Sequence, residues 1–218
     1  MLAPISRSFA AETIDDPGLP DDLAAEVHRN LTMTHLVLGN VHALVDRIRR
    51  SETPVKTVLD IGCGDGGILR KIRDKLGIQV TGVDLRQPST MSMGIPIVVA
   101  DATRDPLPES DVAIAVCVIH HLDDESLKEM VRNVGRYCRR FIILDLVRHR
   151  LPIALFRTFM CPWLHPINCA DGVISIQRSY RPGELRKVVE SALVGTQARF
   201  IHTVAPLYMR QIVDIRYC

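Results

Sequence analysis

Aromatic residues are scarce in this chain, at 5% of 218 residues, and the net charge at pH 7 is only +2. Proteins that bind nucleic acids often stack bases on aromatic side chains and carry a marked excess of lysine and arginine. Anionic membrane surfaces also attract strongly basic proteins. The composition therefore disfavours a nucleic-acid or membrane-surface partner.

Long apolar runs are missing as well. The first residues contain no apolar core of a secretory signal and turn acidic early. The most apolar segment, 151–170, is interrupted by Arg157, His165 and two prolines, so it is too polar to span a bilayer. We therefore expect a soluble, cytoplasmic protein with no stable membrane insertion.

The cysteines follow no regular spacing, and in a cytosolic protein we expect reduced thiols. Three residues, Cys161, His165 and Cys169, have the spacing C-x3-H-x3-C. However, Pro162 and Pro166 interrupt the helix that would place them on one face, and no fourth ligand is evident. The sequence thus predicts core packing here and no metal site. The six cysteines are Cys63, Cys117, Cys138, Cys161, Cys169 and Cys218.

Helical and strand patterns alternate along most of the chain. Apolar residues recur at three- and four-residue steps over 21–50, which predicts helices. Further helices are expected up to residue 76 and over 124–138 and 182–193. Short β-branched runs predict strands at 56–61, 78–85, 96–100, 111–119, 141–147, 198–204 and 207–215.

These strands are apolar on both faces and mostly separated by helices, as in a parallel sheet covered by helices. The last two are joined by so short a turn that they must be antiparallel. The sequence thus predicts an α/β fold: a doubly wound, mostly parallel, seven-stranded sheet with an antiparallel C-terminal hairpin. We expect residues 1–54 to form a helical cover over an acceptor site. Residues 55–218 would form the cofactor-binding domain, with an apolar insert at 150–180.

A glycine-rich loop follows the first strand, in 58-VLDIGCGDGG-67. Its spacing fits both the dinucleotide pattern G-x-G-x-x-G and the pattern D-x-G-x-G-x-G. Charge separates them, because Asp60 and Asp65 would each cost about 1 kcal/mol beside a pyrophosphate. A ligand with an ammonium and a sulfonium reverses that sign, which favours S-adenosylmethionine over NAD.

Three later segments agree with such a cofactor. Asp84, in 80-VTGVDLR-86, is placed to accept hydrogen bonds from both ribose hydroxyls. Asp101, in 100-ADATRDPLP-108, could accept from an adenine amino group. The strand in 111-DVAIAVCVIHHL-122 runs into a pair of histidines at the edge of the expected pocket.

Together with FIILD at 141–145 and 179-SYRPGEL-185, these motifs make residues 55–215 resemble the class I S-adenosylmethionine-dependent methyltransferases, which have a Rossmann-like fold. The resemblance implies that Arg86 and Arg181 stand where a small polar residue and a capping threonine are usual. It also implies roles at the cofactor. The methionine end would be held by Asp60, Gly62, Cys63 and Gly64, the ribose and adenosine by Asp84 and Leu85, and the adenine by Asp101 and Ala102, with Cys117 and Val118 under the cofactor.

Methyl transfer is an in-line displacement at carbon, in which a base need only help the acceptor ionise. The candidate bases are His120 and His121, which could instead form a wall of the cofactor site, His149 after the fifth strand and His165 in the apolar insert. The candidate acceptor-binding residues are His165, Trp163 and Tyr180.

The apolar insert predicts a small hydrophobic acceptor, aromatic or polyketide-like, methylated on oxygen or carbon. Within the family, the helical N-terminal extension with 15-DDPGLPDDL-23 resembles enzymes that methylate quinones and secondary metabolites. The insert could equally contact a second copy in a homodimer.

Two alternative functions stay open. An RNA methyltransferase could use the basic residues between 136 and 150, although no N-P-P-Y-like tetrapeptide follows the fourth strand. A protein that binds S-adenosylmethionine without transferring its methyl group is the other.

Overall fold

A computed structural model describes residues 5–16, 18–87 and 94–217 of the chain. Its sheet has seven strands in the order β3-β2-β1-β4-β5-β7-β6. Strand β7 is antiparallel to both of its neighbours, and the other pairs are parallel. The predicted fold class is confirmed. The strands are β1 (Thr57–Ile61), β2 (Gln79–Asp84), β3 (Ile97–Val99), β4 (Ser110–Val116), β5 (Cys138–Asp145), β6 (Arg199–Val204) and β7 (Gln211–Arg216).

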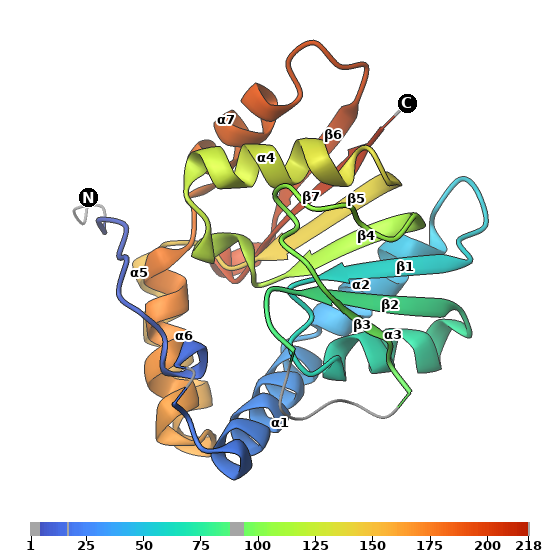
Figure 1. Ribbon diagram of the computed structural model, residues 1–218. Helices are drawn as coiled ribbons and strands as arrows, with labels where there is room; N and C mark the ends of the chain where they lie inside the picture. Colours follow the sequence, from blue (N-terminus) through green and yellow to red (C-terminus); the bar gives the residue numbers. More distant parts are fainter. Residues whose placement is uncertain (1–4, 17, 88–93, 218) are drawn as a thin grey trace.

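Helices cover both faces of this sheet and one of its ends (Figure 1). Helices α2 and α3 lie on one face, and α4 and α7 lie on the other. Within the described residues, no helix is both long and apolar enough to traverse a bilayer. The helices are α1 (Asp21–Val37), α2 (Asn40–Arg49), α3 (Gly67–Leu76), α4 (Asp124–Val134), α5 (Arg150–Leu155), α6 (Pro166–Arg178) and α7 (Pro182–Ala192).

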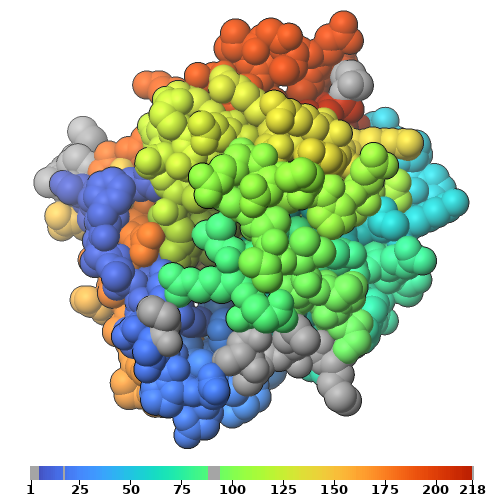
Figure 2. Space-filling model, in the orientation of Figure 1, coloured from blue at the N-terminus to red at the C-terminus, as the bar shows by residue number. Residues whose placement is uncertain are grey.

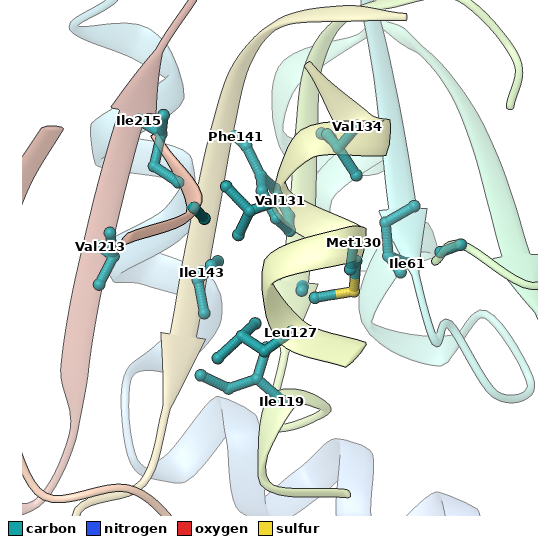
Figure 3. Close-up of a cluster of buried hydrophobic side chains, with 14 of the residues drawn as sticks. Ile61, Ile119, Leu127, Met130, Val131, Val134, Phe141, Ile143, Val213 and Ile215 are labelled. Atoms are coloured by element: carbon teal, nitrogen blue, oxygen red, sulfur yellow. The ribbon is translucent and has the colours of Figure 1, made fainter. Parts of the chain in front are cut away.

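Side chains of each central strand alternate between two apolar layers, as the pleat of a strand requires. In β1, Val58 belongs to the layer with α2 and α3, whereas the next residue, Leu59, belongs to the layer with α4 and α7. Figure 3 shows the second layer, in which Val131 of α4 faces Phe141 and Ile143 of β5. Phe141 is fully buried, and truncating such a side chain to alanine costs about 3–5 kcal/mol.

A further layer lies beyond the carboxyl ends of the parallel strands, made of α1, α5, α6 and the N-terminal segment (Figure 1). The Asn168 side chain of α6 donates to the Val27 carbonyl of α1 at 3.0 Å. The backbone N–H groups of Thr13 and Ile14 donate to the two carboxylate oxygens of Asp171, each at 2.9 Å. In Figure 2 the N-terminal segment lies on the surface against this part of the molecule. The first and last thirds of the chain therefore meet beyond the carboxyl ends of the parallel strands.

Helix α2 belongs to the core of the sheet domain, although it falls within residues 1–54. Its residues Val41, Leu44, Val45 and Ile48 are all buried against the sheet. Only α1 and the residues before it have the position expected of a cover. The division at residue 54 stays a prediction.

The prediction of reduced thiols is wrong for one pair. Cys161 and Cys169 form a disulfide, and their Cα atoms lie 5.0 Å apart. The chain turns through a 3₁₀ helix, Cys161–Trp163, before α6 begins at Pro166, so the two prolines that break a continuous helix bring the sulfurs together. Cys63, Cys117 and Cys138 are free thiols, and Cys218 lies outside the described residues.

Candidate active site

The glycine loop after β1 depends on backbone conformations that favour glycine. Gly62 and Gly64 have φ angles of 69° and 53°, in the left-handed region where a side chain is strained. A Cβ atom on Gly62 would also lie 2.5 Å from a methyl carbon of Val118. The loop thus brings bare backbone against the end of β4, where the resemblance predicts the cofactor.

Asp60 is buried beside this loop, with 2% of its surface exposed. Desolvation, reinforced by the nearby charge of Asp84, raises the pKa of its carboxyl well above the usual value. Among the described residues, its Oδ1 atom has no hydrogen-bond partner. A buried carboxylate oxygen without a donor is costly, so the loop suits a ligand that brings a cationic donor and fits the ammonium of S-adenosylmethionine.

Asp84 at the end of β2 connects the second strand to the glycine loop. Its Oδ2 accepts a hydrogen bond from the Gly64 N–H at 2.9 Å, and its Oδ1 accepts from the Arg86 N–H at 3.3 Å. Leu85 next to it is 65% exposed, which leaves an apolar surface for an adenosine. Cys63 within the loop is half-buried, and burial raises the pKa of its thiol.

After β3, the side chain predicted to bind the adenine, Asp101, already has partners among its sequence neighbours. Asp101 Oδ1 accepts from the N–H and the hydroxyl of Thr103, and Oδ2 lies 3.1 Å from Arg104 Nε. These interactions lower the pKa of the Asp101 carboxyl, chiefly through the Thr103 hydroxyl. Ala102 is buried. The carboxylate is therefore charged and fixed in direction by its neighbours.

The end of β4 has an unusual backbone. Cys117 has a positive φ of 55°, which costs a residue other than glycine about 1–3 kcal/mol and is often found at functional sites. Burial raises the pKa of its thiol well above the usual range, so the thiol stays protonated. Cys117 and Val118 therefore suit a wall of the cofactor site, and the protonated Cys117 thiol is not a nucleophile.

The histidine pair after β4 sits among carboxylates. His120 is buried, its Nδ1 lies 2.8 Å from Asp145 Oδ1, and its backbone N–H donates to Asp145 Oδ2 at 3.0 Å. Although desolvation opposes it, the charge of Asp145 together with the contacts to Asp145 and Glu12 raises the pKa of His120 to about 9. An imidazole already protonated at neutral pH is a poor base. The ring of His121 lies against that of His120, tilted by 35° with 4.4 Å between the ring centroids, and is partly exposed.

The other predicted residues lie apart from this pair or are already engaged. His149 and His165 each accept a backbone N–H at the start of a helix, from Leu151 and Ile167 respectively. His149 also stacks on Tyr208. Tyr180 is buried and donates its hydroxyl to the Leu122 carbonyl at 3.0 Å.

Trp163 is 87% exposed. An indole so exposed suits the predicted contact with a second copy better than a pocket wall. Its role and those of His149, His165 and Tyr180 stay predictions.

The sequence prediction missed four residues near the site. Glu12 and Asp15 approach the histidine pair from the N-terminal segment, and Asp145 ends β5 directly behind it. His28 of α1 covers the glycine loop: its Cε1 would lie 3.3 Å from a Cβ on Gly64. Only Asp145 had a sequence signal, as the acid at the end of FIILD, where the carboxyl ends of parallel strands gather functional groups.

Comparison with known proteins agrees with this geometry. Residues 58–140 match the family described as a methyltransferase domain. The match covers the glycine loop, Asp84, Asp101 and the histidine pair. The match confirms the methyltransferase class that the motifs predict. A methyltransferase domain implies S-adenosylmethionine as cofactor. No curated protein matches the chain significantly.

Solved structures share the fold at low sequence identity. The plantazolicin methyltransferase BpumL, in complex with a monoazolic desmethylPZN analog and SAH, has a TM-score of 0.66 at 13% identity, over 89% of this chain and 88% of that chain. Human N-acetylserotonin methyltransferase with SAM has a TM-score of 0.60 at 13% identity, over 91% of this chain.

A third similar structure, from Nostoc punctiforme and assigned as an O-methyltransferase, has a TM-score of 0.63 at 13% identity over 97% of this chain. The chain spans 56% of the human enzyme and 64% of the Nostoc protein. At these identities the likeness shows the fold.

Proposed function

We propose that this chain, whose residues 58–140 form a methyltransferase domain, transfers a methyl group from S-adenosylmethionine to an oxygen or carbon of a small hydrophobic acceptor. The observation that carries the proposal is Asp60, a buried carboxylate with an unpaired oxygen beside a loop of bare backbone. A dinucleotide would bring a pyrophosphate toward that charge, whereas a sulfonium cofactor brings positive charge.

The donor side of the reaction needs positioning above all. When bound, S-adenosylmethionine supplies an electrophilic methyl group on a cationic sulfur. In our proposal Asp60 pairs with the cationic methionine end, and the backbone of Gly62 and Gly64 approaches it closely. Asp84, held toward the loop by the Gly64 N–H, accepts from the ribose hydroxyls. Holding the reactants in line accounts for much of the rate enhancement in such a displacement.

The acceptor side is covered by α1 and the layer beyond the strand ends. Two residues of α1 lie over the loop: Thr32 Oγ1 would be 2.5 Å from a Cβ on Gly67, and His28 approaches Gly64. Helix α6 binds α1 through Asn168. A cover at this place excludes water during transfer and favours a compact acceptor over a polymer. An aromatic or polyketide-like acceptor fits the apolar composition of the insert.

Some of the arginines that an RNA methyltransferase would need for phosphate contacts are already paired with carboxylates. Arg140 is buried and makes two hydrogen bonds with Asp214, at 2.8 and 2.6 Å. Arg148 is buried and binds both oxygens of Glu184, at 2.6 and 2.7 Å. Guanidinium groups committed to carboxylates are not available for phosphates, which supports a small-molecule acceptor.

The experiment is a methyl-transfer assay with S-adenosylmethionine carrying a radiolabelled methyl group. The purified chain is offered a panel of phenols, quinols and polyketide-like compounds and, separately, total RNA. We expect label in an organic-soluble small product and none in RNA. Asp60→Ala should abolish transfer, whereas Asp74→Asn, at an exposed acid on α3 that pairs with its neighbour Arg73, should not.

Each of the two alternative functions predicts a different result of this assay. Label in RNA, with a rate that falls steeply as salt is raised, would overturn the small-molecule acceptor. Tight binding of S-adenosylmethionine without label in any acceptor would favour the non-methylating protein.

A further inference from the structure

A cluster of metal-ligand side chains lies at the histidine pair. Single donor atoms of Glu12, His120 and His121 all lie within 4.8 Å of one another. The Nε2 atoms of His120 and His121 lie 3.4 and 3.9 Å from the same atom, Glu12 Oε1. These residues come from the N-terminal segment and from the 3₁₀ turn after β4, more than a hundred positions apart, so only the fold brings them together.

The outer nitrogen of each ring faces a second carboxylate. His120 Nδ1 lies 2.8 Å from Asp145 Oδ1, and His121 Nδ1 lies 3.3 Å from Asp15 Oδ2. A carboxylate only accepts hydrogen bonds, so in the neutral imidazole these contacts favour the proton on Nδ1 and leave the lone pair on Nε2. Metal-binding histidines usually have this arrangement, in which a carboxylate orients the ring from behind.

The inner nitrogens of both rings then point at the same carboxylate oxygen, Glu12 Oε1. Among the described residues, His120 Nε2 is buried and has no hydrogen-bond partner. A lone pair that faces a carboxylate oxygen at 3.4 Å is repulsive unless a proton or a cation lies between the two atoms. This buried nitrogen without a hydrogen-bond partner indicates a ligand, in addition to the clustering of the three side chains.

The charges in contact with the cluster match a dication. Glu12, Asp15 and Asp145 carry one negative charge each, and Arg178 lies 4.0 Å from both Glu12 Oε1 and Asp15 Oδ2. With both imidazoles neutral, as metal ligands must be, two negative charges remain, so binding of the ion would release the proton that His120 holds in its absence. Ser175 Oγ donates to Glu12 Oε1 at 2.9 Å, as carboxylates that bind metals are commonly supported.

We propose that Glu12, His120 and His121 bind a divalent transition-metal ion. Two imidazoles and a carboxylate suit zinc, iron, cobalt or manganese and leave coordination positions open. Donors at about 2.1 Å from a tetrahedral ion lie roughly 3.4 Å apart, and the observed separations of 3.4 and 3.9 Å are close to that. The site departs from the sequence prediction, which contained no metal.

The position suggests a use for the ion that rests on the proposed function. The His121 side chain is 28% exposed, so the cluster is accessible from one side. An oxygen of the acceptor could take an open coordination position there. An ion bound to a hydroxyl lowers its pKa, which would let the acceptor ionise without a separate protein base.

Metal binding is tested on the full chain after treatment with EDTA and dialysis. Zn²⁺ is titrated by calorimetry, and Co²⁺ is titrated by visible absorption, which reports coordination number and would reveal sulfur ligands at the free cysteines. We expect one equivalent bound without a thiolate charge-transfer band. Glu12→Gln and His121→Ala should each weaken binding at least tenfold. His42→Ala, at an exposed histidine on α2, should not.

Binding of S-adenosylmethionine is measured on the same samples, because it checks the fold of each variant and separates the two proposals. His121→Gln provides a second variant if the alanine variant does not fold. If folded wild-type protein binds no stoichiometric Zn²⁺, or if the variants bind it equally well, the proposal is overturned, and a proton shared between His120 and Glu12 explains the geometry. That outcome would leave the methyltransferase proposal intact as long as the cofactor still binds.

Discussion

Replacing Asp60 by asparagine keeps the shape of the side chain and removes its charge. Asp60 is buried, with an unpaired oxygen beside the glycine loop. In our proposal that oxygen accepts from the cationic end of the cofactor. A hydrogen bond to a charged group contributes about 1.5–3 kcal/mol. Asp60→Asn should therefore weaken S-adenosylmethionine binding roughly 10- to 150-fold.

The same substitution should not destabilise the ligand-free protein. Because the folded pKa of Asp60 is raised above its usual value of 3.8, the native state holds this proton more tightly than the unfolded chain. The contribution of Asp60 to stability is then full at low pH and falls, by about 1.4 kcal/mol per pH unit, as pH rises from 3.8 through the folded pKa. The asparagine variant lacks this loss and should be at least as stable at pH 8.

Two assays follow from this reasoning. Calorimetric titration in buffers of different ionisation enthalpy should show that wild-type protein releases a proton on binding, since the cationic ligand favours the ionised carboxylate, whereas Asp60→Asn should release none. Titration with S-adenosylhomocysteine, which has the ammonium but no sulfonium, identifies the partner. Equal weakening for both ligands assigns Asp60 to the ammonium, and weakening for S-adenosylmethionine alone assigns it to the sulfonium.

The reasoning is refuted if Asp60→Asn binds both ligands within twofold of wild type. It is also refuted if the same variant is less stable than wild type at pH 8, because the carboxylate would then have a structural partner. Asp74→Asn, on the exposed side of α3, is the matched control in each titration.

Three further predictions concern the frame of the site. Gly62→Ala should cost at least 2 kcal/mol in urea unfolding, because the new methyl group meets Val118 in a left-handed backbone conformation; Gly183→Ala, where a Cβ meets nothing within 4 Å, is the control. Reducing the Cys161–Cys169 disulfide should lower the unfolding free energy by about 2–3 kcal/mol, the loop-closure value for so short a loop, and reductant should leave Cys161→Ser/Cys169→Ser unchanged. Arg140→Met should cost about 3–5 kcal/mol in thermal or urea unfolding, because the buried Asp214 carboxylate loses both short hydrogen bonds and keeps the longer contact with Arg47 at 3.6 Å; Asp214→Leu added to it should restore most of that loss.

The sheet and the cofactor half of the site were predictable because their signals are local. Each strand is an apolar run that must be buried, and a parallel sheet places the residue after each strand at one edge. Asp60, Asp84 and Cys117 were found by that rule, and they lie at the ends of β1, β2 and β4. Strand β5 begins at Cys138 rather than 141 because Arg140, polar in sequence, is buried through its ion pair with Asp214.

The acceptor half was not predictable because its contacts are long-range and polar. Nothing in residues 5–16 shows a period that would direct Glu12 to His120. The disulfide between Cys161 and Cys169 was missed because reduced thiols are expected in a cytosolic protein, whereas the turn that Pro162 and Pro166 impose brings the two sulfurs together. Glu12 and His120 lie far apart in the sequence, and the docking of the N-terminal segment on α6 brings them together.

The two halves of the site are therefore held by different forces. The glycine loop rests on strands whose side chains fill two apolar layers, and the hydrophobic effect fixes its geometry. The 3₁₀ turn that carries Glu12 to the histidines, Thr13–Asp15, buries none of its residues and is held by hydrogen bonds to Asp171. Segments held in this way open at lower free energy than a core strand. Cofactor binding should accordingly tolerate the loss of that segment's contacts, whereas any ion or acceptor bound at Glu12 should not, and a cation shared by Glu12, His120 and His121 would itself fasten the segment in place.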